Sequence, residues 1–146
     1  MKLRIAWVGK TKESAIQALT AEYARRIARY NPSETTEAAS EAAVLKLLLK
    51  SSRTSPVFVA LDPRGKQISS EALAEFIRLH LERGTQELVF AIGPADGWSS
   101  EALNAAQLKL SLGPMTLPHE LARVVLLEQL YRAFTILNNH PYHGGH

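Results

Sequence analysis

The chain has 146 residues, of which 46% are hydrophobic and 21% charged, and its formal net charge is +3 at pH 7. This length and composition suit one globular domain over 1–146 and lie outside the range of disordered proteins. The absence of cysteine excludes disulfides, thiolate metal ligands and a cysteine nucleophile. No apolar run approaches the roughly 20 residues of a membrane span, and the first apolar stretch is too brief for a signal sequence. We therefore expect a cytoplasmic protein with no membrane partner.

Positive charge is concentrated near the N-terminus, where residues 1–30 carry seven Lys or Arg and two Glu. A basic face can bind nucleic-acid phosphates, because neutralising them releases counterions. The same residues also suit the solvated face of a helix. Charge alone leaves both interpretations open.

The first half of the chain alternates apolar runs with helical patterns. The apolar run 3–8 predicts a strand, and apolar residues at intervals of three or four predict a helix over 16–30 that ends before Pro32. The segment 33–40 is polar and small, and a second helix is expected over 42–49.

Apolar runs without polar alternation at 57–61 and 88–92 predict strands that are covered on both faces. The first of these runs ends in a turn signal at Asp62-Pro63-Arg64-Gly65. A helix is expected over 73–81, with Gly84 placed for its C-terminal cap.

The last part of the chain predicts a short helix through Leu103, capped by Ser99 or Ser100, then a strand over 108–112 and a final helix over about 120–137. Alternating strands and helices predict an α/β domain with a mostly parallel sheet flanked by helices. Such sheets bind ligands beyond the carboxyl ends of their strands. Conspicuous loops follow three of the predicted strands, at 61–66, 93–97 and 113–116, so we expect a pocket there.

Two common nucleotide-binding fingerprints are absent, because the chain has neither the dinucleotide glycine pattern nor a Walker lysine motif. The final helix is apolar on more than one face, which suits either a homodimer interface or a central core helix. Within it, Glu128 and Arg132 have the spacing and order of a helical ion pair.

The C-terminal third resembles the signature of a known family. The stretch 110–123, LSLGPMTLPHELAR, together with EQLYRAF at 128–134 and HPYH at 140–143, is similar to the RlmH family of the SPOUT methyltransferase class. Further similarities lie in the first ten residues, in Glu22-Tyr23 and Arg25-Arg26, and in Leu61-Asp62 and Gly65-Lys66. The resemblance extends over about 1–143.

This resemblance implies an α/β domain with a deep C-terminal trefoil knot, of the SPOUT type. It also implies a homodimer whose active site draws on both subunits. The implied activity is S-adenosylmethionine-dependent methyl transfer to N3 of a pseudouridine in large-subunit (23S) ribosomal RNA, with that RNA or the assembled ribosome as partner. The segment after Pro32 lacks the apolar strand of relatives, which puts an edge strand of the sheet in question.

The family positions that hold S-adenosylmethionine correspond here to residues at or just after the ends of the three predicted strands: Leu61, Gly93, Leu112, Gly113, Pro114, Met115, Thr116 and Leu117. Two departures from the family are Pro94 and Pro114, which have no backbone N–H to donate. Carbonyl groups and apolar side chains remain available for cofactor contacts.

The implied chemistry needs a base and a stabilised anion. The N3–H of pseudouridine lies between two carbonyls, so the nitrogen becomes a nucleophile once the proton leaves, and fixed cations or donors stabilise the anion. Candidate catalytic residues cluster near the C-terminus: His119, Arg123, Arg132, Tyr142 and His143.

Several of these candidates have a structural alternative. His143 could form a structural hydrogen bond at a dimer interface, Arg132 could only pair with Glu128, and Tyr142 could be a buried tyrosine with a bonded hydroxyl. No metal is expected, because His140, His143 and His146 lack a fourth ligand or a supporting carboxylate.

Two other functions stay open from the sequence. One is a methyltransferase of the same class that acts on another RNA, such as transfer RNA. The other is a non-catalytic ribosome- or RNA-binding factor, which would follow if Pro94 and Pro114 abolish cofactor binding.

Overall fold

The structure is a computed structural model that describes residues 1–49 and 54–144. Its sheet has five strands in the order β2-β1-β4-β3-β5. The strands are β1 (Lys2–Val8), β2 (Ser33–Ala38), β3 (Val57–Gln67), β4 (Glu87–Ile92) and β5 (Leu108–Ser111). The helices are α1 (Ser14–Ala28), α2 (Glu41–Leu49), α3 (Ser70–Glu82), α4 (Ser100–Ala105), α5 (His119–Leu137) and the short 3-10 helix η1 (Pro141–Gly144).

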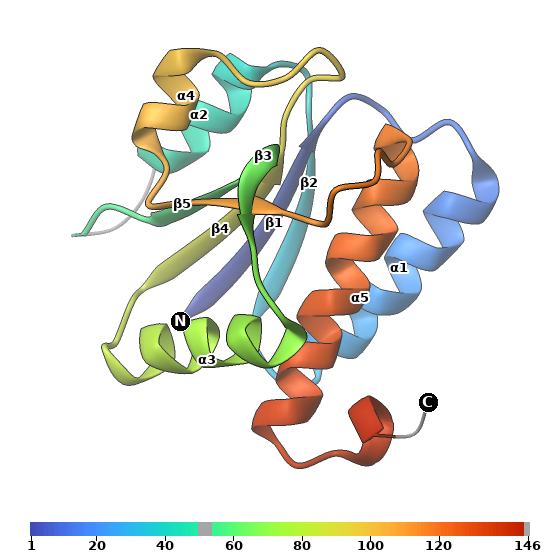
Figure 1. Ribbon diagram of the computed structural model, residues 1–146, viewed down its shortest axis with the longest axis vertical. Helices are drawn as coiled ribbons and strands as arrows, with labels where there is room; N and C mark the ends of the chain where they lie inside the picture. Colours follow the sequence, from blue (N-terminus) through green and yellow to red (C-terminus); the bar gives the residue numbers. More distant parts are fainter. Residues whose placement is uncertain (50–53, 145–146) are drawn as a thin grey trace.

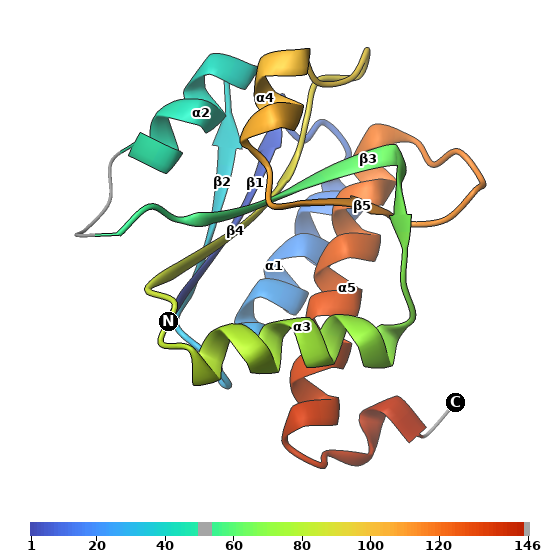
Figure 2. The ribbon, with the colours of Figure 1, turned by 60° about the vertical axis from the view of Figure 1, so that its left-hand side comes forward.

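All four strand pairings are parallel, which confirms the predicted α/β class. Helices α1, α3 and α5 cover one face of the sheet, while α2 and α4 cover the other (Figures 1 and 2). The trefoil knot stays a prediction. None of the helices among the described residues combines the length and hydropathy that a membrane crossing requires.

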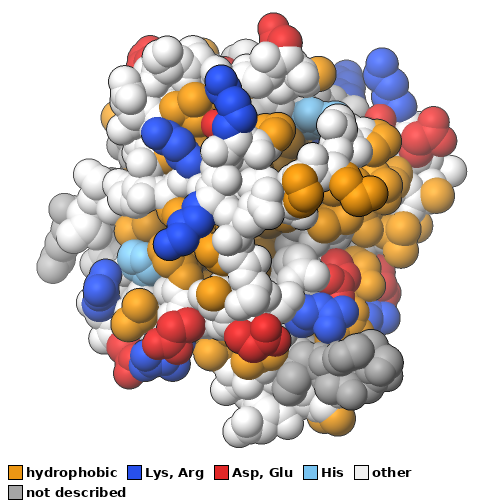
Figure 3. Space-filling view, in the orientation of Figure 1, with side chains coloured by type: hydrophobic (Ala, Val, Ile, Leu, Met, Phe, Trp, Pro, Cys, Tyr) orange, Lys and Arg blue, Asp and Glu red, His pale blue; other side chains and the backbone are white. Residues whose placement is uncertain are grey.

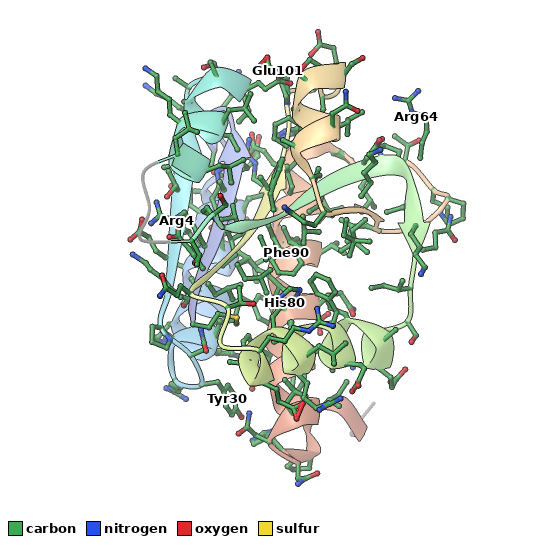
Figure 4. All side chains as sticks on the ribbon, turned by 90° about the vertical axis from the view of Figure 1, so that its left-hand side faces the viewer. Arg4, Tyr30, Arg64, His80, Phe90 and Glu101 are labelled. Atoms are coloured by element: carbon green, nitrogen blue, oxygen red, sulfur yellow. The ribbon has the colours of Figure 1, made fainter. Side chains whose placement is uncertain are left out.

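The central strand β4 is buried on both faces, as its unbroken apolar run predicts. Leu88 and Phe90 pack in the core beneath α3 and α5, and Val89 and Ala91 pack in the second core beneath α2 and α4. Figure 4 shows Phe90 in the middle of the molecule, between the sheet and the helix that carries His80. Covering both faces excludes water from these strands, so their backbone groups must bond to neighbouring strands.

The polar segment after Pro32 forms the edge strand β2, although it lacks the apolar run that would predict a strand. Its backbone pairs with β1 from Leu3–Ser33 to Val8–Ala38. An edge strand has one face and one side in solvent, so it needs little apolar surface. Ala38 is its buried residue, and Glu34 forms an ion pair with Lys2 at 3.0 Å.

Strand β3 does not end at the predicted turn but continues to Gln67. Leu110 of β5 pairs with Leu61 and again with Lys66, so the intervening residues form a bulge within the strand. The turn signal therefore marks a bulge rather than the end of an element. Gly65 is required here, because a Cβ at this position would lie 2.6 Å from the carbonyl oxygen of Lys109.

Helix α5 packs against both α1 and α3, and buried residues cover most of its circumference. The interpretation as a core helix is therefore confirmed for most of its surface. Leu121 at its first turn is the exception, with 41% of its surface exposed. The predicted ion pair within α5 is also present, with Arg132 Nη2 2.7 Å from Glu128 Oε2.

Replacing Gly65 with alanine should lower the free energy of unfolding by about 1–3 kcal/mol, because backbone atoms of β5 must move to admit the methyl group. Thermal and urea denaturation would measure the loss. Lys66→Ala, at an exposed position in the same strand, is the matched control. Equal stability of Gly65→Ala and the control would contradict the close approach described for this bulge.

Candidate functional site

A cavity of about 310 Å³ lies at the carboxyl edge of the sheet. Its walls come from the bulged part of β3, from the segment after β4, and from the connection between β5 and α5 with the first turn of α5. Three parts of the chain that are distant in sequence therefore meet there. Parallel strands place their carboxyl ends at one edge, which explains why these loops converge. The sequence prediction of a pocket at this edge is confirmed.

Each of the eight residues that the family resemblance predicts for cofactor binding lines this cavity. They are Leu61 in β3, Gly93 after β4, and Leu112, Gly113, Pro114, Met115, Thr116 and Leu117 after β5. Both prolines that lack a donor, Pro94 and Pro114, also lie in the wall. The lining is mostly apolar side chains and backbone, with the Asp62 carboxylate as its acidic group.

The turn after β5 is built from a serine and a glycine. The Gly113 amide donates to the Ser111 hydroxyl at 3.1 Å, and this hydroxyl donates to the Gly113 carbonyl at 3.0 Å. Gly113 has a φ of 134°, which a side chain would disfavour. These bonds turn the chain sharply into the cavity wall.

Trp98 is a site residue that the sequence reasoning missed. Its indole N–H donates to the Leu61 carbonyl at 2.9 Å, and its ring lies directly against Gly93. A Cβ on Gly93 would lie 2.6 Å from Trp98 Cδ2, so only glycine leaves room for the ring. The sequence does contain a signal for this residue, because Trp98 is a large aromatic side chain only five positions after Gly93 at the end of a predicted strand.

His119 and Arg123 lie one helical turn apart on α5, and only His119 lines the cavity. His119 Nε2 is 2.6 Å from the Gly93 carbonyl oxygen, and its Nδ1 is 2.9 Å from Arg123 Nη2. Arg123 is 2% exposed and donates to the Thr11 hydroxyl at 2.8 Å. Burial lowers the pKa of the Arg123 guanidinium, while nearby Glu120 and Glu37 act in the opposite direction.

The first turn of α5 is also tied to the connection between β1 and α1. The Glu120 carboxylate accepts hydrogen bonds from the amides of Lys12 and Glu13, each at 3.1 Å. These backbone donors hold the pKa of Glu120 below its usual range, with the Glu13 amide as the largest cause. The start of α5 is therefore also held by a segment that does not line the cavity.

Arg132 belongs to the C-terminal half of α5 and Tyr142 to η1, and neither residue lines the cavity of the same chain. Arg132 is thirteen positions after His119 in the helix, which corresponds to about 20 Å along the axis. The Tyr142 hydroxyl donates to Glu128 Oε2 at 2.8 Å, and the Arg132 guanidinium lies 5.2 Å from the Tyr142 ring centre. Burial, followed by the bond to Glu128, raises the pKa of Tyr142, and the bond to Glu128 raises the pKa of Arg132.

The structure thus divides the five catalytic candidates. His119 and Arg123 lie at the cavity end of α5, whereas Arg132 and Tyr142 lie at the opposite end. The side chain of His143 lies outside the described residues, as does that of His146. Among the side chains that are described, no three His, Asp or Glu residues form a group that could hold a metal ion.

Apolar side chains gather on the surface beside the cavity. Figure 3 shows hydrophobic atoms over the region where β5 connects to α5. Met115 in this connection is 80% exposed, and Leu121 in the first turn of α5 is 41% exposed.

The basic residues near the N-terminus do not form one exposed positive surface. Arg25 and Arg26 pair with Glu22, while Lys10 and Lys12 are exposed.

Two solved structures share the fold of this chain. A putative methyltransferase from Legionella pneumophila, in complex with the bound cofactor SAM, superimposes with a TM-score of 0.56 at 16% identity, covering 91% of this chain and 66% of that chain. A probable methylase family protein from Haemophilus influenzae gives a TM-score of 0.56 at 15% identity, covering 96% of this chain and 69% of that chain. At these identities the likeness shows the fold alone.

Sequence relatives are much closer. The family model described as a predicted SPOUT methyltransferase matches residues 1–143. A ribosomal RNA large subunit methyltransferase H from Koribacter versatilis is 62% identical over 146 residues, which is the whole of both chains. A protein of the same name from Trichlorobacter lovleyi is 47% identical, covering 98% of this chain and 99% of the relative. This chain therefore belongs to the SPOUT methyltransferase family and, within it, to the ribosomal RNA large subunit methyltransferases H.

Proposed function

We propose that this protein transfers the methyl group of S-adenosylmethionine to N3 of a pseudouridine in large-subunit ribosomal RNA. The observation that carries the proposal is that all eight residues predicted to bind the cofactor line one cavity. Relatives that match the chain from end to end are named for methylation of this RNA. Because the substrate is ribosomal RNA, we place the protein in the cytoplasm.

The cavity fits the proposed cofactor in size and chemistry. Ligand pockets of roughly 300–1,000 Å³ are usually apolar with a few fixed polar groups, and this cavity meets both conditions. Leu61, Leu112 and Leu117 offer apolar contacts. Backbone carbonyls can accept hydrogen bonds from the cofactor, and neither kind of contact needs an N–H at Pro94 or Pro114. When bound, the cofactor supplies an activated methyl group on a sulfonium.

The remaining task for the protein is to remove the N3 proton and to stabilise the resulting anion while nitrogen and methyl are held in line. Arg132 could supply positive charge and Tyr142 a hydroxyl, and His143 is the candidate base among the family positions. Arg132 lies about 20 Å along α5 from His119 at the cavity of its own chain, and Tyr142 lies beside Arg132. A single chain therefore does not bring the proposed groups to the proposed cofactor.

A homodimer resolves this separation, because a two-fold partner can place the far end of its α5 beside the cavity. The exposed apolar side chains of Met115 and Leu121 lie next to the cavity and would be covered by such a contact. We propose an active site that combines the cavity of one subunit with Arg132, Tyr142 and His143 of the other.

The first test is cofactor binding and substrate choice. Calorimetry with S-adenosylmethionine should show binding, and labelled methyl groups should enter ribosomes or large subunits that contain the pseudouridine. Ribosomes with uridine at that position and transfer RNA are the control substrates. No binding at millimolar cofactor would favour a non-catalytic RNA-binding factor, and labelling of transfer RNA alone would favour the other methyltransferase function.

The second test concerns Gly93. Gly93→Ala should weaken cofactor binding about tenfold, because its methyl group forces the Trp98 ring or the loop into the cavity. Trp98→Leu in the same chain removes the clash and should recover part of the affinity, with Trp98→Leu alone as the control. Unchanged affinity of Gly93→Ala would show that this loop lies away from the cofactor.

The third test concerns the composite site. Gly93→Val and Arg132→Ala should each inactivate a homodimer, and a mixture allowed to exchange subunits should recover about a quarter of wild-type activity, since half of random dimers have one intact site. If each site belonged to a single chain, mixing would restore nothing. Native mass spectrometry of the mixture would verify that mixed dimers have formed.

A further inference from the structure

The ring of His119 is held between a backbone carbonyl and a buried guanidinium. Nε2 lies 2.6 Å from the Gly93 carbonyl oxygen, and Nδ1 lies 2.9 Å from Arg123 Nη2. A guanidinium only donates and a carbonyl only accepts, so in the neutral ring Nδ1 must accept and Nε2 must carry the proton. Both ring nitrogens are therefore engaged, and the contacts select one tautomer.

Arg123 is itself held from the side away from the cavity. Its Nη1 donates to the Thr11 hydroxyl at 2.8 Å, and its guanidinium lies 5.5 Å from the centre of the Trp7 ring. The Thr11 amide in turn donates to Glu37 of β2 at 3.2 Å. The chain of contacts thus runs from the edge strand, through Arg123 and His119, to Gly93.

Burial of the charged Arg123 side chain lowers the stability of the fold. It is 2% exposed, its Nε has no partner among the described atoms, and no carboxylate bonds to it directly. A buried charge without a bonded counter-charge has an unfavourable desolvation free energy, and an apolar side chain of similar size would fill the same space without it. The orientation of its guanidinium toward His119 suits a role in the site better than a role in packing.

We propose that Arg123 and His119 are positioning residues that set the Gly93 loop for the cofactor. Arg123 selects the Nε2–H tautomer of His119, and this N–H holds the Gly93 carbonyl in one orientation at the cavity wall. His119 is then not the base that removes the N3 proton, because neither ring nitrogen is free. This inference rests on the proposed cofactor site.

Two replacements of His119 separate positioning from base catalysis. His119→Phe removes both hydrogen bonds and should weaken S-adenosylmethionine binding about tenfold, as expected for one lost bond to a buried carbonyl. His119→Gln has an amide N–H for the Gly93 carbonyl and an oxygen for Arg123, so it should recover most of that affinity. The His119→Gln variant should also turn over at saturating cofactor, although it has no basic nitrogen.

Two results would overturn the proposal. In one, His119→Phe binds the cofactor as tightly as wild type. In the other, both variants bind normally but lose turnover equally, which is the behaviour of a lost base. Circular dichroism and melting temperature would verify that each variant is folded.

A spectroscopic test needs no variant and no cofactor. Nitrogen-15 NMR of the histidine-labelled wild-type protein should show an unprotonated Nδ1 and a protonated Nε2 for His119. Finding the proton on Nδ1 would overturn the inference while leaving the proposed function intact. Conversely, failure of the wild-type protein to bind cofactor would overturn the proposed function without changing the tautomer.

Discussion

Parallel pairing of β4 with both β1 and β3 is the constraint on which the rest of the structure depends. Residues from Leu88 to Ile92 are buried on both faces, so their backbone groups can bond only to the neighbouring strands. Parallel strands must then end at the same edge of the sheet. That edge is where the chain turns after Leu61, after Ile92 and after Ser111, and the cavity lies among these turns. The site is thus a consequence of how the core is buried.

Helix α5 connects two chemically different regions. Its first turn contributes to the cavity through His119, and its later turns hold Glu128, Arg132 and, through η1, Tyr142. The helix is rigid because most of its circumference packs against the sheet, α1 and α3. Its ends therefore cannot approach each other within one chain. The same rigidity makes α5 suitable for carrying one subunit's side chains to a partner's cavity at a fixed distance.

Gly93, in the cavity wall, is contacted by side chains from two other parts of the chain. Trp98 packs against its Cα, His119 bonds to its carbonyl oxygen, and Pro94 follows without an N–H. The loop closes on itself through one bond, from the Gly97 amide to the Pro94 carbonyl at 2.8 Å. Side chains from other elements therefore orient the start of this loop. Its geometry depends on residues that are five and 26 positions away in sequence.

Much of the fold followed from local patterns, because burial on both faces requires the unbroken apolar runs seen at 57–61 and 88–92. The edge strand β2 was missed, since a strand with solvent on one side needs no such run. The bulge in β3 was mistaken for a terminal turn, because the same residues suit both and only pairing with β5 distinguishes them.

For the site, the sequence by itself determined which loops surround the cavity, and through the family resemblance which eight residues line it. Only the tertiary structure decided which side chains meet there. It placed Trp98 against Gly93, engaged both nitrogens of His119, and separated Arg132 and Tyr142 from the cavity of their own chain. The reason is physical: strand and helix patterns are local, whereas contacts between side chains depend on strand register and on the length of the helix between them.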